Sequence, residues 1–384
     1  MDNIAGQKSS LTWAVHISVA LLVALWLLPT LGLFVSSFRS ADQIAATGWW
    51  KSLFSQEQNV VIHTEKPYQQ KLMDGMYVIE GNLFAQDGAE EGVVSVWGTS
   101  SKEISAYTAG DKADLGDKGF LTVEVNGDYR FEKDTEFTGS RGQRVFLTAK
   151  TPPSFSLDNY RTVLGKDSGT SSMAKAFINT LTVSIPSTII PILIAAFAAY
   201  ALAWMDFPGR ALLIAFVVGL LVVPLQLALI PLLKLHLGVG IGKGYLGVWL
   251  AHTGFGLPLA IYLLRNYMVG LPKDIIENAR VDGATEFQIF VKIILPLSFP
   301  ALASFAIFLF LWTWNDLLVA LVFLIDSSGD TTVMTRQIVE LLCSKGGNWE
   351  ILATAAFVSI SVPLFVFFAM QKYLVRGLLA GSVK

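Results

Sequence analysis

LPKDIIENARVDGATEFQIFVKIILPLSFP, residues 271–300, lies between two long apolar runs, yet it has the pattern of neither a simple loop nor a membrane span. Pro272 is suited to the first position of a helix, where its missing N–H costs nothing. Gly283 interrupts the helical pattern, because glycine adopts backbone angles that other residues avoid. Thr285 followed by Gln288 has the spacing of a capping box. The stretch therefore predicts two short helices joined at a glycine.

The two predicted helices are amphipathic. Ile275, Ile276 and Ala279 form an apolar stripe on the first helix, and Glu277 lies off that stripe. Pro296 is expected to end the segment where the next apolar run begins. Such a segment between two spans is suited to binding another protein or the membrane surface. An interfacial helix that only orders a loop is the alternative, and patterning leaves both open.

Composition indicates a membrane protein. The chain has 384 residues, of which 53% are hydrophobic and 15% are charged, well below the ~25% charged residues of soluble domains. The formal net charge of −2 gives no electrostatic reason to expect nucleic acid as a partner. Cys343 is the single cysteine, so neither an internal disulfide nor a metal site built on cysteines is expected.

Six membrane spans are expected, because about 20 apolar residues cross a bilayer. The apolar runs cover residues 17–34, 177–204, 211–235, 245–264, 301–325 and 351–370. The first run is too long for a cleaved signal peptide and lacks a small-residue cleavage site, so we expect it to stay as a span.

The polar stretch at residues 39–174 separates the first span from the second. Residues 60–152 predict a small β-rich domain, a sandwich or a barrel. LTVEV and DYRFE, joined by Asn126-Gly127, predict a hairpin with a two-residue primed turn. The expected organisation is residues 1–38 as N-terminus and first helix, residues 39–174 as an extracytoplasmic insert, and residues 175–384 as helices two to six with the 271–300 loop and the tail.

The charges predict an orientation. Six spans place both ends on one side, and the short segments assigned to that side are richer in Lys and Arg than the short loops opposite. These inner cations are Lys8, Arg210, Arg265, Lys273, Arg280, Lys292, Lys372, Arg376 and Lys384. We therefore expect both termini and the 271–300 loop in the cytoplasm and the β-rich insert outside.

The loop also carries a specific spacing. It resembles the "EAA" loop of importer permeases in the ATP-binding-cassette class, with Asn278 standing where a second alanine is usual. The matching residues are Glu277, Ala279, Gly283, Ile293, Leu295 and Pro296. In that family the loop is the coupling helix, which docks into a cleft on the ATPase subunit.

The resemblance extends over residues 11–40 and 155–384. Segments such as NTLTVSIPST, VPLQLALIPL, FGLPLAIYLLRNY and WTWNDLL are similar to the MalG-like sugar permease subfamily of bacterial inner-membrane proteins. An insert of this length between the first two spans resembles the alpha-glucoside permeases of proteobacteria. The resemblance implies an all-α polytopic fold of six transmembrane helices, the type I importer permease fold, with a β-rich extracytoplasmic insert.

The resemblance also implies partners and roles. The implied partners are a second, different permease, a pair of ATPase subunits that bind ATP and magnesium, an extracytoplasmic sugar-binding protein, membrane lipid and a sugar. The resemblance implies no cofactor or metal in this chain. The implied ATPase-coupling residues are Glu277, Ala279, Arg280, Asp282, Gly283, Ala284, Ile293, Leu295 and Pro296. The tail is similar to a C-terminal extension into the ATPase interface, which implies contacts by Gly377, Gly381 and Lys384.

Sugar sites combine aromatic faces with hydrogen-bonding side chains. The candidates for a substrate path are Gln226, His252, Trp312, Asn315 and Asp316, of which the last three are expected on one face of the fifth span. A packing or subunit-interface role is the alternative for all five, since the partner permease can hold the sugar.

Three other functions have less support. A proton-coupled secondary sugar transporter would need a relay of carboxylates and repeated spans, and the sequence has one mid-span Asp and no convincing repeat. A membrane-anchored sensor would need one span, and an enzyme would need a nucleophile–base or metal grouping. GVGIGKGY has Gly244 where a phosphate loop requires Ser or Thr, so no nucleotide site is expected.

Overall fold

The computed structural model describes residues 10–73, 75–86, 92–165, 173–325, 329–344 and 348–379. The chain divides into two compact units. The insert unit comprises residues 1–160 and 347–354, and the helical unit comprises residues 161–346 and 355–384.

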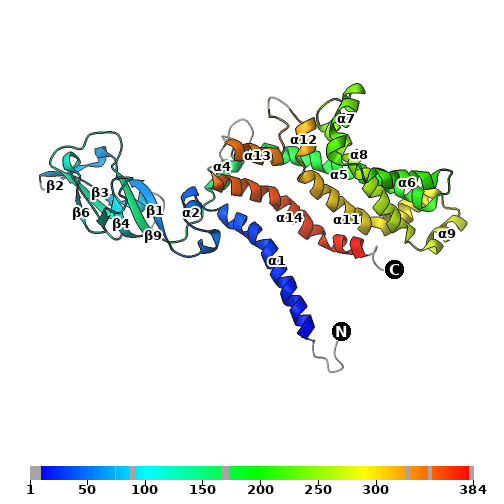
Figure 1. The fold of residues 1–384 in the computed structure, drawn as a ribbon, viewed down its shortest axis with the longest axis horizontal. Helices are drawn as coiled ribbons and strands as arrows, with labels where there is room; N and C mark the ends of the chain where they lie inside the picture. The colour runs from blue at the N-terminus through cyan, green and yellow to red at the C-terminus, as the bar shows by residue number, and fades with distance from the viewer. Residues whose placement is uncertain are drawn as a thin grey trace. The chain divides into compact units, whose positions relative to one another are not determined.

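The insert unit begins with one long helix and continues into a two-sheet domain (Figure 1). Its helices are α1 (Ser10–Ser36), α2 (Ala41–Ala46) and α3 (Leu83–Gln86), with 3-10 turns at Trp49–Lys51, Pro67–Gln69 and Gly116–Lys118. Its strands are β1 (Gln56–His63), β2 (Lys71–Met73), β3 (Met76–Asn82), β4 (Val93–Gly98), β5 (Tyr107–Thr108), β6 (Lys112–Asp114), β7 (Phe120–Val123), β8 (Asp128–Lys133) and β9 (Arg144–Thr151).

The strands form two antiparallel sheets, in the orders β1-β9-β4-β5 and β2-β3-β8-β7-β6. Along β8, exposed Asp128 and Arg130 alternate with buried Tyr129 and Phe131, the period-two pattern of a strand with one buried face. Both sheets contribute to a single core, in which Trp97 is fully buried. The predicted β-rich insert is confirmed, and two facing sheets make it a sandwich.

The predicted hairpin forms, but its turn is not the two-residue turn that the sequence suggested. The N–H of Glu124 donates to the oxygen of Asp128 at 2.7 Å, and the N–H of Gly127 donates to the oxygen of Glu124 at 3.0 Å. Three residues therefore connect the paired positions, and Gly127 takes a φ of 86°. A three-residue loop with glycine in the left-handed region is another common hairpin solution.

The helical unit consists of helices packed around α5, α8 and α11, which contact one another. The elements are α4 (Asp158–Leu164), which starts in the insert unit, α5 (Met173–Trp204), α6 (Arg210–Leu220), α7 (Leu225–Gly238), α8 (Tyr245–Val269), α9 (Lys273–Val281), α10 (Glu286–Ile289), a π-helical turn at Phe290–Ile294, α11 (Leu295–Trp314), α12 (Leu318–Phe323), α13 (Met334–Ser344) and α14 (Trp349–Leu379). Small residues on α5 and α8, such as Ala199 and Ala260, are fully buried, which lets the two helices approach closely.

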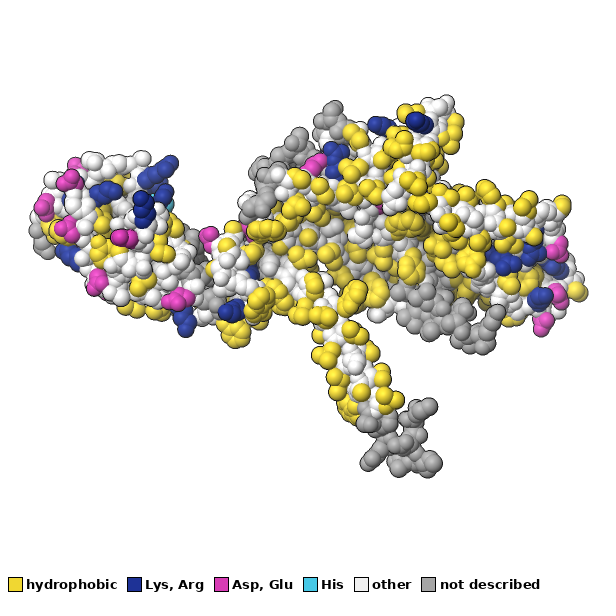
Figure 2. Space-filling view, in the orientation of Figure 1, with side chains coloured by type: hydrophobic (Ala, Val, Ile, Leu, Met, Phe, Trp, Pro, Cys, Tyr) yellow, Lys and Arg dark blue, Asp and Glu magenta, His cyan; other side chains and the backbone are white. Residues whose placement is uncertain are grey.

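Five helices of the described chain are long and apolar enough to cross a membrane. They are Leu11–Ser36, Met173–Trp204, Tyr245–Val269, Glu286–Trp314 and Trp349–Tyr373. Figure 2 shows apolar side chains over the visible face of these helices, whereas Lys, Arg, Asp and Glu gather at the end that carries α9.

The expected third span is not one straight helix. α6 and α7 pass the same length and apolarity test only as a pair, and they meet at a bend of 109°. The break falls between Leu220 and Leu225, where Pro224 takes an extended conformation as the N-cap of α7. Because proline disfavours a helical residue before it, the chain leaves the helix there. The described chain therefore has five spans, or six if the bent pair is one span.

The fifth span also differs from the expectation. α11 ends at Trp314, and the chain turns through Asn315 and Asp316 before α12 begins at Leu318. The side-chain amide of Asn315 donates back to the oxygen of Leu311 at 2.8 Å, which satisfies a carbonyl at the helix end. The prediction that Trp312, Asn315 and Asp316 share one helical face is therefore wrong.

Candidate functional site

α9 attaches to the helical unit by one side and exposes the other. Ile276 is 1% exposed and joins a core cluster that includes Leu264, Met268 and Ile289. Ile275 is 42% exposed and Val281 is 86% exposed. The predicted apolar stripe is thus divided, because Ile276 anchors the helix while Ile275 lies on an outer, uncovered face.

Gly283 ends α9 in a hydrogen-bonded turn. It has a φ of 81°, in the left-handed region that favours glycine. Its N–H donates to the oxygen of Arg280 at 3.0 Å, and the N–H of Ala284 donates to the oxygen of Ala279 at 3.0 Å. These two bonds form a Schellman motif, which satisfies the last carbonyls of the helix. The predicted glycine joint is confirmed.

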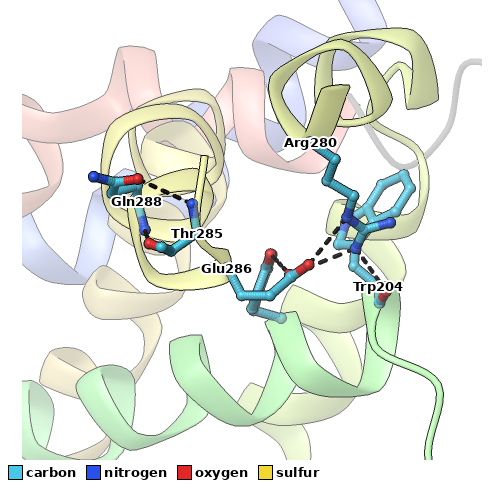
Figure 3. Close-up of polar contacts among 6 residues, drawn as sticks. Trp204, Arg280, Thr285, Glu286 and Gln288 are labelled. Carbon is cyan, nitrogen blue, oxygen red and sulfur yellow. Dashed lines mark hydrogen bonds and ion pairs between the residues drawn. The ribbon is translucent and has the colours of Figure 1, made fainter. Parts of the chain in front are cut away.

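Thr285 starts the second helix, as predicted. Its Oγ1 accepts from the N–H of Gln288 at 3.3 Å, and Oε1 of Gln288 accepts from the N–H of Thr285 at 2.9 Å, which makes a complete capping box. Figure 3 shows both bonds.

Pro296 does not end this segment. α10 passes through the π-helical turn at Phe290–Ile294 directly into α11, and Pro296 lies in the first turn of α11. The N–H of Leu295 donates to the oxygen of Phe290, one residue further back than in an α-helix. The chain is helical on both sides of Pro296, so this proline does not break the helix.

A polar cluster joins three helices at this end of the unit (Figure 3). Glu286, the first residue of α10, accepts a hydrogen bond from Nε of Arg280 at 3.0 Å and another from the hydroxyl of Tyr200 at 2.5 Å. Nη2 of Arg280 also donates to the backbone oxygen of Trp204, the last residue of α5, at 3.2 Å. We call Tyr200, Arg280 and Glu286 the α5–α9–α10 cluster.

The electrostatics of this cluster favour its charged state. The hydrogen bond that Arg280 donates to Glu286 raises the pKa of Arg280 above its ordinary value, so the guanidinium stays charged at physiological pH. Arg280 lies in the last turn of α9 and Glu286 in the first turn of α10, the helix ends at which a cation and an anion are each stabilised.

The residues expected to contact an ATPase fall into two groups. Glu277, Arg280, Asp282, Gly283 and Pro296 are exposed. Ala279, Ala284, Ile293 and Leu295 are partly buried, and three of them, Ala279, Ala284 and Leu295, pack against the core cluster. The first group is available to a partner, whereas these three fix the segment to the unit.

The substrate-path candidates are only partly gathered. Nε2 of His252 and Oδ2 of Asp316 lie 3.9 Å apart, with side chains 4% and 10% exposed. Oδ2 of Asp316 also accepts from the N–H of Val319 at 2.9 Å, so the carboxylate caps α12. Trp312 and Asn315 are exposed, and Gln226 is exposed in the first turn of α7.

The predicted tail contacts receive no structural account. Gly377 lies within α14, but its surroundings are outside what the structure describes. Gly381 and Lys384 lie outside the described residues.

Sequence reasoning missed Tyr200 and Glu286. Glu286 carried a weak local signal, because a carboxylate directly after a capping threonine and six residues after an arginine can reach across a glycine turn. Tyr200 carried none, since it lies 86 residues from Glu286 in the chain. Its ring packs against Phe290 with centroids 5.3 Å apart, a contact that depends on the tertiary fold.

The fold and the capped double helix between spans define a class of membrane permease. Residues 168–379 match the family described as binding-protein-dependent transport system inner membrane component. The chain belongs to this family. It is therefore an inner-membrane permease subunit of an ATP-binding-cassette importer, and the predicted type I importer permease fold is confirmed.

Particular relatives show how far the likeness extends. The chain is 61% identical to the alpha-glucoside transport system permease protein AglG of Rhizobium meliloti (strain 1021), over 98% of each chain. It is 58% identical to the osmoprotective compounds uptake permease protein GgtD of Synechocystis sp. (strain ATCC 27184 / PCC 6803 / Kazusa), over 60% of this chain and 76% of the relative. It is 33% identical to the trehalose transport system permease protein SugB of Mycobacterium tuberculosis (strain CDC 1551 / Oshkosh), over 61% of this chain and 84% of the relative.

Among solved structures, a bacterial ABC transporter involved in the import of the acidic polysaccharide alginate aligns with a TM-score of 0.46 at 21% identity. The alignment covers 58% of this chain and 81% of that one.

Proposed function

We propose that this chain is one of two different permease subunits of a bacterial importer for an alpha-glucoside or another oligosaccharide. A pair of ATPase subunits and an extracytoplasmic sugar-binding protein complete the importer. The observation that carries the proposal is the 61% identity to an alpha-glucoside permease over 98% of both chains, because this match includes the insert.

The segment from α9 to α10 is the proposed docking element for the ATPase. Its outer face offers the exposed apolar side chains Ile275, Val281 and Phe287, the last 65% exposed, beside the carboxylates of Glu277 and Asp282. Exposed apolar side chains interspersed with charged ones suit a helix that lies in a groove of a partner. Its inner face is held by Ile276 and the α5–α9–α10 cluster, so a displacement of the segment by the ATPase moves the helical unit, and a movement of the helical unit displaces the segment.

ATP and magnesium belong to the ATPase partners in this proposal. This chain contributes no nucleotide site of its own, and its part in catalysis is mechanical. ATP-driven closure of the ATPase pair displaces the docked segment, and the helical unit reopens outward to receive sugar from the binding protein. His252 and Asp316 remain proposed residues of the sugar path, because they form a buried polar pair beside the break between α11 and α12.

The main experiment isolates the tagged chain with its co-purifying proteins and reconstitutes the complex in vesicles with the sugar-binding protein. We expect uptake of labelled maltose, sucrose or trehalose that requires ATP on the ATPase side. Uptake that follows an imposed proton gradient in the absence of ATP would instead establish a proton-coupled secondary transporter.

Orientation can be tested with the native thiol. Cys343 is the single cysteine of the chain and is exposed on α13. The proposal places α13 on the extracytoplasmic side of the membrane. A membrane-impermeant maleimide should label Cys343 in intact spheroplasts. In a Cys343→Ser background, Lys273→Cys should react only after the membrane is opened. Labelling of Lys273→Cys in intact spheroplasts would contradict the proposed topology.

A further inference from the structure

Glu286 is shared between two partners on different helices. It accepts from Arg280, whose backbone belongs to α9, and from Tyr200, near the C-terminal end of α5. Arg280 closes the arrangement by donating to the oxygen of Trp204 at the end of α5. The carboxylate thus links the short helix that the proposed function assigns to docking with a helix of the central bundle.

The two contacts differ in how strongly water screens them. Arg280 and Glu286 have side chains 40% and 43% exposed, and ion pairs this exposed contribute little alone. Tyr200 is 5% exposed, and a tyrosine hydroxyl at such a site needs a hydrogen-bond partner. Removing Glu286 would therefore leave a nearly buried hydroxyl without the acceptor it has here.

The C-terminal end of α5, to which Arg280 binds, is itself held by further hydrogen bonds. The last carbonyl groups of a helix have no partner within the helix and attract cations. Arg210 occupies some of these positions, because it donates to the oxygens of Leu202, Ala203 and Met205. Arg280 takes the oxygen of Trp204, so two arginines from different segments hold the same helix end, and one of them comes from α9.

We propose that Glu286 is a positioning residue that holds α9 to the end of α5, so that a displacement imposed on α9 by an ATPase is passed to α5. The proposal rests on the proposed function for the origin of the displacement and on the structure for the link.

The first experiment tests the link in the full-length chain alone, by hydrogen exchange in detergent. Glu286→Gln keeps the shape of the side chain and removes its charge. We expect the backbone amides of α9 to exchange about threefold to tenfold faster in this variant, with those of α8 unchanged. Equal exchange of α9 in both proteins would overturn the proposal, whatever the complex transports.

The second experiment measures transported sugar per ATP hydrolysed in the reconstituted complex. Glu286→Gln should lower this ratio by about threefold or more while the ATPase still co-purifies. Tyr200→Phe should lower it less, because this change removes one hydrogen bond to Glu286 and leaves the bond from Arg280 in place. A ratio equal to that of the wild type would overturn the transmission role.

Asp206→Asn provides the matched control. Asp206 pairs with Arg210 at 3.0 Å near the same end of α5, and its side chain is 99% exposed. We expect neither the exchange of α9 nor the ratio to change. If the wild-type complex shows no ATP-driven uptake, the proposed function fails, while the exchange experiment still decides whether Glu286 holds α9.

Discussion

The β-rich insert and the α9–α10 segment are stabilised in opposite ways. The insert carries its own core, in which Trp97, Leu121 and Val145 have no exposed surface and every contributor belongs to the same sandwich. The α9–α10 segment has no core of its own. Ile276 and Ile289 are buried in a cluster made mostly by α5, α8 and α11.

This difference bears on which region of the chain can be changed without disturbing the helical bundle. The match to the permease family covers residues 168–379 and leaves the insert outside it. A domain with its own core can be added or remodelled without disturbing the bundle. A segment that borrows its core from three helices cannot change independently of them, and for the same reason it can act on them.

The largest expected effect is confined to the insert. Trp97→Ala removes a fully buried ring and its Nε1 bond to the oxygen of Thr108, and should destabilise the sandwich by about 3–5 kcal/mol. Hydrogen exchange of the intact chain should rise in β4 and β9 and stay unchanged in α9. Val93→Ala, on an exposed position of β4, is the control. Faster exchange in α9 would show that the two regions are not independent.

A smaller effect is expected at the anchor of α9. Ile276→Ala should cost about 2–4 kcal/mol, because it opens a cavity in the core shared with α8. Ile275→Ala, at the exposed neighbouring position, should change stability by less than about 0.5 kcal/mol. Thermal unfolding measures the first difference. Co-purification of the ATPase should show the reverse order for docking, and a loss of stability in Ile275→Ala would contradict this division.

Next is the backbone at the joint. Gly283→Ala should cost about 1–2 kcal/mol, because a residue with a β-carbon is strained at a φ of 81°. Space is not the cause, since a β-carbon there would meet no described atom within 4 Å. Gly219→Ala is the matched control, because its β-carbon also meets no described atom but its φ is ordinary. We expect uptake to fall severalfold in the first variant and to persist in the second.

The smallest effect tests charge in the insert. The hydrogen bond from Lys112, together with Arg130, holds the pKa of Glu132 below its ordinary value of 4.5. Its stabilisation is therefore complete above that value and is lost as pH falls through the lower pKa of the folded state. Glu132→Gln should speed exchange in β8 by about threefold at pH 7, consistent with an effect below ~1 kcal/mol, because both cations are half exposed.

The ratio of variant to wild-type exchange in β8, measured at each pH, should fall toward one as the pH is lowered from 7 through the folded-state pKa of Glu132. A ratio that stays constant between pH 7 and pH 3 would mean that the charge of Glu132 contributes nothing.

Local signals predicted the parts of the fold that local physics decides. The capping box at Thr285 and the glycine joint at Gly283 formed as the sequence indicated, because each depends on residues within one turn. The bend between α6 and α7 did not follow from sequence, since Pro224 breaks a helix whereas Pro186, Pro191 and Pro231 lie inside intact helices. Whether neighbours satisfy the freed carbonyls decides the outcome, and that is a tertiary property.

The candidate site shows the same limit. Arg280 could be selected from its position in the loop as a candidate ATPase contact. In the structure its guanidinium instead donates to Glu286 and to the oxygen of Trp204, so it also contacts the helical bundle. Asp316 was selected as an ionisable group within an expected span, and the structure uses it to cap α12 beside His252. Both outcomes depend on residues distant in sequence, which no local pattern specifies.

The π-helical turn at Phe290–Ile294 makes chain length itself a determinant of this region. Five residues here fill what about four residues fill in a regular α-helix, so the turn accommodates one extra residue while α10 keeps its orientation. A residue inserted into or deleted from the regular part of α11 has no such accommodation and would rotate α10 about the helix axis by roughly 100°. Deleting one residue from Phe290–Ile294 should therefore be tolerated better than deleting one from the regular part of α11.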